Sequence, residues 1–120
     1  MPDAVPASDP DLPVRWLSLP DVATALSVPV TRVHQLLRDG ALLADRIDGV
    51  LKVPADFVQD GAVVKGLTGT ITLLRDAGYD DEGALRWLYR PDDSLPGTPV
   101  QALVSNRGTE VKRRAQASAF

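Results

Sequence analysis

The sequence of 120 residues contains no cysteine, one histidine and few aromatic residues, and each shortage excludes a class of protein. Without cysteine the chain cannot form disulfides, which is consistent with the cytosol. His34 alone cannot build a zinc site of the usual nitrogen and sulfur ligands, so we expect no metal and no other cofactor. The sequence also lacks a glycine-rich phosphate loop and a Gly-x-Ser-x-Gly elbow, and it offers no nucleophile for His34 to activate. We therefore do not expect an enzyme.

No apolar run approaches membrane-spanning length and no signal peptide is present, so we expect a cytoplasmic protein that does not contact a membrane. The net charge is −3 and the sequence pI about 4.9. This balance argues against a protein that coats nucleic acid indiscriminately, because such affinity comes mainly from neutralising phosphates. The charge is uneven, however: residues 31–65 sum to zero, whereas residues 107–120 carry +3 and form the most basic stretch.

Composition and periodicity divide the chain into three parts. Residues 1–13 hold four prolines and three aspartates, and we predict a disordered acidic arm there. Residues 14–65 are predicted to form a winged helix-turn-helix, and residues 66–120 a helical region packed on it. The predicted fold class is therefore mainly α, with one small β-hairpin. Trp16, at the start of the folded part, is expected to pack on the first helix.

The pattern from residue 19 to residue 54 organises the chain. Ser18 can cap a helix over Leu19–Leu26, and the break at Ser27–Pro29 has the length of a helix-turn-helix turn, although glycine, often found there, is absent. A second helix, Val30–Arg38, ends at the glycine stop Gly40. Two helices joined by so short a turn cannot run antiparallel, which favours a helix-turn-helix.

The second helix separates into an apolar and a polar face. Val33, Leu36 and Leu37 make the buried stripe, so the rest of the helix points mostly outward. Arginine can donate two bonds to guanine, glutamine can pair with adenine, and threonine can reach a phosphate or a thymine methyl. We therefore predict that this helix enters the major groove of double-stranded DNA. Its candidate contacts are Thr31, Arg32, His34, Gln35 and Arg38. The alternative is an ordinary surface helix, whose exposed face is polar anyway.

A small hairpin is predicted next, over residues 43–53. Asp48-Gly49 stands between two short runs rich in apolar and β-branched residues, which is a strong signal for a two-residue hairpin turn. This wing carries Arg46 and Lys52, which would meet the DNA backbone if the second helix lies in the groove. Alternatively, the two cations only solvate an edge strand.

Two resemblances follow from these segments. Residues 19–54 resemble the excisionase and MerR-type winged helix family through Ser27–Pro29, Arg38–Leu42 and Val53-Pro54. A longer resemblance is to a family of small actinobacterial DNA-binding proteins, whose mycobacterial member is a substrate of a membrane serine/threonine kinase. The supporting segments are Val28–Val33, Val63–Leu67, Asp76–Tyr79, Arg86–Leu88 and Val111–Ala117.

The longer resemblance implies a cytoplasmic winged helix-turn-helix protein, with transcription regulation as the expected role. It also implies a serine/threonine kinase as partner, with DNA affinity controlled by phosphorylation of an N-terminal threonine. That feature does not carry over, because residues 1–17 contain no threonine and Ser8 is the only hydroxyl there.

The C-terminal part is predicted to be helical. Residues 54–58 form a short helical turn and residues 61–66 a connector, and helices follow over 67–77 and 82–89, the latter capped by Asp80 and Asp81. Residues 91–99 form a loop, and a last helix spans 109–117. Four cations near the end could touch DNA phosphates, or could form a solvated helix end where positive charge opposes the helix dipole. They are Arg107, Lys112, Arg113 and Arg114.

A second function class comes from residues 87–103. This segment resembles the toxin-binding half of some antitoxins, which end in a comparable Pro-x-x-Ala-Leu element, here Pro99–Leu103. The alternative to DNA binding is therefore a protein-interaction module, antitoxin-like or an adaptor, in which the C-terminal half binds a partner protein.

Overall fold

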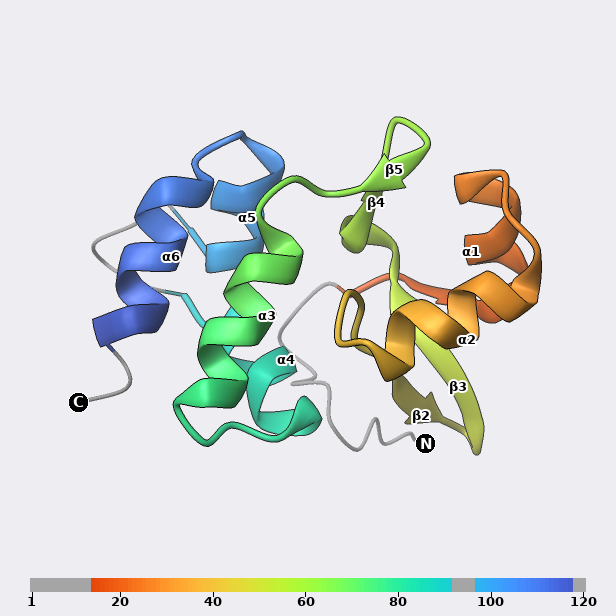
Figure 1. The fold of residues 1–120 in the computed structure, drawn as a ribbon, viewed down its shortest axis with the longest axis horizontal. Coiled ribbons are helices and arrows are strands. Elements are labelled where there is room, and N and C mark those ends of the chain that lie inside the picture. The colour runs from red at the N-terminus through yellow and green to blue at the C-terminus, as the bar shows by residue number, and fades with distance from the viewer. Residues whose placement is uncertain (1–13, 92–96, 118–120) are drawn as a thin grey trace.

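The computed structural model describes residues 14–91 and 97–117, which form a mainly helical structure with two small antiparallel sheets (Figure 1). The first half contains β1 (Trp16–Ser18), α1 (Leu19–Leu26), α2 (Val30–Arg38), β2 (Asp45–Ile47), β3 (Val50–Pro54), the 3-10 helix η1 (Ala55–Phe57), β4 (Val58–Gln59) and β5 (Ala62–Val63). The second half contains α3 (Leu67–Asp76), α4 (Asp81–Tyr89), α5 (Pro99–Val104) and α6 (Gly108–Ala117). The predicted acidic arm and the centre of the predicted loop, residues 92–96, lie outside the described residues.

The helix-turn-helix has the predicted bounds. Ser18 begins α1, and its hydroxyl accepts a hydrogen bond from the backbone N–H of Asp21 at 3.2 Å. In the turn, Ser27 takes the left-handed conformation (φ +58°) for which glycine is usual. Two backbone bonds hold it, from Ser27 N to Thr24 O at 3.1 Å and from Val28 N to Ala23 O at 3.0 Å. Ser27 thus takes the left-handed backbone conformation that a glycine usually takes in this turn.

The wing is also confirmed, and it belongs to a larger sheet than predicted. Asp48 (φ +54°) and Gly49 (φ +82°) form the left-handed turn between β2 and β3. The prediction missed β1, which pairs antiparallel with the other side of β3 and gives the strand order β1-β3-β2. Trp16 lies half-buried in β1 opposite Pro54, and its predicted packing on the first helix stays a prediction.

A second hairpin replaces part of the predicted connector. Strands β4 and β5 pair around Asp60 (φ +54°) and Gly61 (φ +81°). This is the same Asp-Gly turn as in the wing, but its strands are only two residues long and leave almost no periodicity in the sequence.

Three helices of the second half, α3, α4 and α6, begin and end close to their predicted positions, whereas α5 was not predicted as a helix. The Asp80 side chain caps α4 by accepting from Gly83 N at 2.7 Å, whereas Asp81 lies inside the first turn and pairs with Arg75. Thr98 and Gln101 form a reciprocal capping box at the start of α5. Pro99, predicted to end a loop, is therefore the first residue of a helix.

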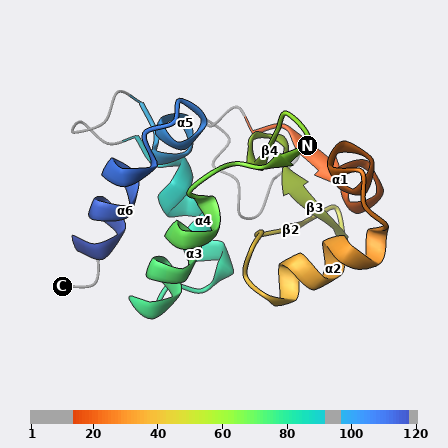
Figure 2. The ribbon, with the colours of Figure 1, turned by 45° about the horizontal axis from the view of Figure 1, so that its top comes forward.

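Both halves share one hydrophobic core. In Figures 1 and 2, α1, α2 and the wing lie at one end of the molecule and α6 at the other, with α3 and α4 between them. The halves also meet through polar contacts: Thr68 Oγ1 of α3 donates to Ala41 O at 3.1 Å, just after α2, and the Tyr89 hydroxyl of α4 donates to Asp56 at 3.0 Å. Within residues 14–91 and 97–117, no helix is long and apolar enough to cross a membrane, and no cluster of three potential metal ligands occurs.

Candidate nucleic-acid interface

Helix α2 presents all five predicted reading residues to solvent. Val33 is fully buried and Leu36 and Leu37 are half-buried, which fixes the rotation of the helix about its axis. The opposite side carries the exposed polar residues Thr31, Arg32, His34, Gln35 and Arg38. The structure therefore brings these five side chains together on one face.

Two residues of this face are already linked. The Arg32 guanidinium donates to the Gln35 side-chain carbonyl at 2.8 Å, one helical turn further on. This bond orients the guanidinium and leaves the Gln35 amide N–H groups for other acceptors. Arginine and glutamine are side chains that can each make two hydrogen bonds to the edge of one base.

The wing holds its two cations on different faces. Arg46 lies opposite Leu51 and Lys52 opposite Asp45, so side-chain alternation points the two cations to opposite sides of the sheet. Arg46 is exposed, and its guanidinium donates to Gly49 O in the turn at 3.4 Å. Lys52 is half-buried. The wing therefore offers one positive charge on each face near its tip.

Acidic residues limit the positive potential of this region. Asp39 follows α2, Asp48 forms the wing turn, and Asp45 lies in β2. One oxygen of Asp45 accepts from Arg46 N at 2.8 Å, while the other is buried and has no hydrogen-bond partner among the described residues. Arg32, Arg38, Arg46 and Lys52 form no ion pair with the described part of the chain, so their charges are not cancelled by direct contact.

The four C-terminal cations lie apart from this face. Arg107 is paired with Glu110, with nitrogen–oxygen distances of 2.7 and 3.3 Å. Lys112 runs along α3, where its side chain occupies the space beside Gly69. Arg113 and Arg114 are exposed on α6. Figures 1 and 2 both place α6 at the far end of the molecule from α2, so the structure does not join the two groups.

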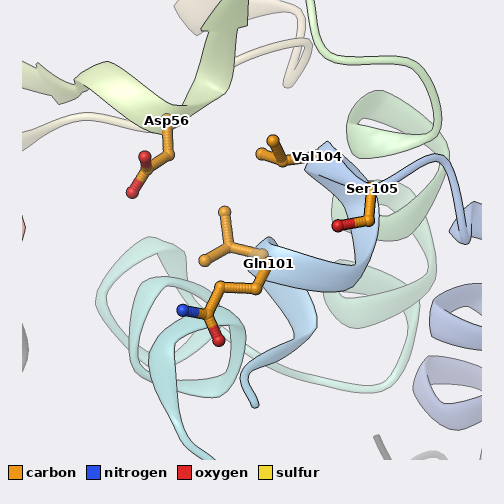
Figure 3. A pocket seen from close by; sticks show the side chains of 5 residues that line it. Asp56, Gln101, Val104 and Ser105 are labelled. Atoms are coloured by element: carbon orange, nitrogen blue, oxygen red, sulfur yellow. The ribbon is translucent and has the colours of Figure 1, made fainter. Parts of the chain in front are cut away.

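Sequence reasoning missed a pocket between the two halves. It has a volume of about 400 Å³ and is open to solvent (Figure 3). Val100 and Val104 of α5 give it apolar surface, and Asp56 of η1 faces them. Gln101 and Ser105 complete the lining. Only folding brings η1 to α5, so no local pattern could have found this site.

Asp56 also accepts the hydrogen bond of Tyr89, whose side chain is almost entirely buried. Burial raises the pKa of the Tyr89 hydroxyl far above its ordinary value, and the negative charge of Asp56 and the hydrogen bond to it add to the effect. The phenol is therefore protonated at neutral pH and donates a hydrogen bond to Asp56 in the pocket wall.

Comparison with known proteins now assigns the family. The profile described as "DNA-binding protein Rv2175c, wHTH domain" matches residues 4–58, and the profile described as "Rv2175c C-terminal domain of unknown function" matches residues 64–119. The chain belongs to the Rv2175c family. Its winged helix-turn-helix is thus established both by the fold and by the family.

One relative and one solved structure support the assignment. The DNA-binding protein Rv2175c of Mycobacterium tuberculosis is 44% identical over 125 residues, which cover 93% of this chain and 84% of the relative. The NMR structure of Rv2175c superposes with a TM-score of 0.82 at 43% identity and covers 98% of this chain and 87% of that one. The resemblance inferred from short segments is therefore confirmed over nearly the whole chain.

Proposed function

We propose that this protein binds double-stranded DNA through α2 and the wing and acts as a transcription regulator. The observation that carries the proposal is the exposed polar face of α2, whose two arginines have no ion-pair partner among the described residues and lie beside a wing that carries Arg46 and Lys52. The name of the family, which is that of a DNA-binding protein, agrees with this role. A DNA-binding regulator would work in the cytoplasm of a bacterial cell.

In the proposed complex, α2 lies in the major groove with Arg32, Gln35 and Arg38 nearest the base edges. The bond between Arg32 and Gln35 holds both side chains in place before DNA arrives, which lowers the entropy lost on binding. Thr31 and His34 make secondary contacts. Arg46 and Lys52 meet phosphates on either side of the wing.

The charges of the interface set its salt dependence. If Arg32, Arg38, Arg46 and Lys52 each displace one condensed counterion from the DNA, the slope of log affinity against log salt is about −3.6. Affinity then falls roughly 150-fold between 50 and 200 mM salt. Binding is therefore modest under physiological conditions, in keeping with the net negative charge of the protein.

The experiment compares two double variants of equal charge change. Arg32→Ala/Arg38→Ala removes two exposed cations from α2, and Arg86→Ala/Arg90→Ala removes two exposed cations from the α4 region. Fluorescence anisotropy on a short labelled duplex should show a loss of at least about 60-fold at 0.1 M salt for the first variant, with a slope shallower by about 1.8. The control should bind nearly as well as wild type. Equal losses in the two variants, both with unchanged melting temperature, would place the DNA surface elsewhere.

A second candidate function is protein binding by the C-terminal half. The observation that favours it is the open pocket on α5, the helix whose first five residues are the Pro-x-x-Ala-Leu element. The test is affinity capture with the full chain from nuclease-treated extract, next to a Val104→Asp variant. A protein held by wild type and lost by the variant would support this role, and equal capture by both would count against it.

Kinase control stays a proposal that rests on the family resemblance alone. The hydroxyl available in the arm is that of Ser8, which lies outside the described residues. Treating the protein with a serine/threonine kinase and comparing it with a Ser8→Ala variant by mass spectrometry tests the proposal, because phosphate on both proteins would exclude Ser8 as the site.

A further inference from the structure

Two groups of cations lie at opposite ends of the molecule, on α2 with the wing and on α6. Within residues 14–91 and 97–117, the ion pairs join Arg75 to Asp81, Arg86 to Glu82 and Arg107 to Glu110. Arg15, Lys65 and Arg90 form no ion pair with these residues either and belong to neither group. One group is on α2 and the wing. The other is on α6, where Lys112 and Arg113 form no ion pair with the described part of the chain and Arg114 adds a third charge.

Helix α6 directs Arg113 away from α2. Val111 and Ala115 are fully buried, and α6 packs with this side on α3. At 100° per residue, Arg113 lies on the opposite side of the helix, and Lys112 and Arg114 flank it. Because α3 stands between α6 and α2 in both views, the outer side of α6 faces away from the first interface (Figures 1 and 2).

An acidic turn separates the two cationic surfaces. The turn between α3 and α4 carries Asp76 and Asp80, both exposed, and residues 66–106 sum to −3. In Figure 1 this turn projects at the lower edge of the molecule, between α6 and the wing. A straight duplex that ran along this edge from one surface to the other would pass this turn, where like charges repel its phosphates.

We propose that α6 is a second, sequence-independent phosphate-binding surface and that the protein bridges two DNA duplexes. The proposal rests on the proposed function, because α2 holds the first duplex. Lys112 and Arg113 give a salt slope of only about −1.8 for the second contact, which is weak for one molecule. Many molecules bound along one duplex would present many such surfaces, and their combined binding would hold a second duplex firmly.

The test is a capture assay with the full-length protein. A biotinylated 300-base-pair duplex is fixed to beads, protein is added, and retention of a second, fluorescent duplex without biotin is measured at 0.1 M salt. Anisotropy on a short duplex, measured in parallel, reports binding at α2 alone. The test variant is Lys112→Ala/Arg113→Ala, and the matched control is Arg86→Ala/Arg90→Ala, which removes the same charge from α4 and its end.

Wild type and control should retain the second duplex, and the test variant should lose it, while all three bind the short duplex within about twofold of one another. The loss expected from two phosphate contacts is roughly 60-fold in affinity at this salt concentration. Light scattering should give the same oligomeric state for all three proteins, since a dimer could also bridge through two α2 helices.

Three results would overturn the inference. If wild type binds the short duplex but retains no fluorescent duplex on the beads, the protein does not bridge two duplexes. If the test variant still retains the fluorescent duplex, bridging does not depend on α6. Equal losses of short-duplex binding and of retention in the test variant would show that α6 touches the same duplex as α2. Failure of wild type to bind the short duplex would instead refute the proposed function and the inference with it.

Discussion

Replacing Tyr89 by phenylalanine should change how stability depends on pH. The Tyr89 ring packs against Phe57 with 6.4 Å between ring centroids, and its hydroxyl donates to Asp56 at 3.0 Å. Phenylalanine keeps the ring and removes only the hydroxyl. A hydrogen bond to a charged acceptor contributes about 1.5–3 kcal/mol, but Asp56 is exposed and can regain water. We expect a loss of about 1–2 kcal/mol at pH 7.

The dependence of stability on pH above pH 10 gives the sharper prediction. In the unfolded chain the Tyr89 hydroxyl ionises near its ordinary pKa of 10.0, whereas burial first, and then Asp56, raise that pKa in the folded protein. Below pH 10 both states keep the proton, and the contribution of the hydroxyl to stability is fully present. Above pH 10 only the unfolded chain loses the proton, so the stability of wild type falls by about 1.4 kcal/mol per pH unit from this group.

The assay is urea denaturation of both proteins at intervals from pH 7 to pH 11.5. Other groups titrate in this range in both proteins, so the difference between the two curves isolates Tyr89. The difference should be nearly constant up to about pH 9 and should then shrink, with a slope that approaches about 1.4 kcal/mol per pH unit near pH 11. Parallel curves up to pH 11.5 would mean that the Tyr89 hydroxyl ionises alike in both states, and the burial argument would be refuted.

Two further substitutions test local features of the fold. Thr98→Ala removes the side chain that accepts from Gln101 N at 3.2 Å, and urea denaturation should show a loss of about 1 kcal/mol, with the exposed Thr109→Ala nearly unchanged. Gly40→Ala puts an alanine in a left-handed backbone conformation (φ +76°) and places its methyl group against the Arg75 guanidinium. Gly49→Ala also requires the left-handed conformation (φ +82°), but its methyl group meets no atom within 4 Å. Gly40→Ala should therefore cost about 1 kcal/mol more than Gly49→Ala, and equal costs would show that Arg75 moves aside freely.

Elements with a strong local signal were predictable from sequence. The cap at Ser18, the glycine stop at Gly40 and the wing turn at Asp48-Gly49 depend only on residues a few positions apart in the chain. The local sequence pattern is therefore sufficient to predict them. The exposed face of α2 followed in the same way, because burial of Val33 determines which side chains point outward.

Features that depend on distant partners were not predictable. Strand β1 is three residues long and exists because β3 offers a free edge, and no period can be read from so few residues. The contact of Asp56 with Tyr89 joins positions 33 apart, so neither residue signals the other locally. Asp81, expected to cap α4, pairs instead with Arg75 of α3, a neighbour known only from the fold.

Helix α2 depends on the second half for its position, although it belongs to the first. Gly40 ends the helix, and the Arg75 guanidinium from α3 occupies the space where a side chain of residue 40 would lie. Asp81 of α4 holds that guanidinium at 2.8 Å, and Thr68 of α3 binds the carbonyl of Ala41. The C-terminal end of α2 is thus attached to α3, whose Arg75 is held in turn by α4. Because a recognition helix reads bases only when its orientation is fixed, removal of the second half should weaken specific DNA binding even if the first half still folds.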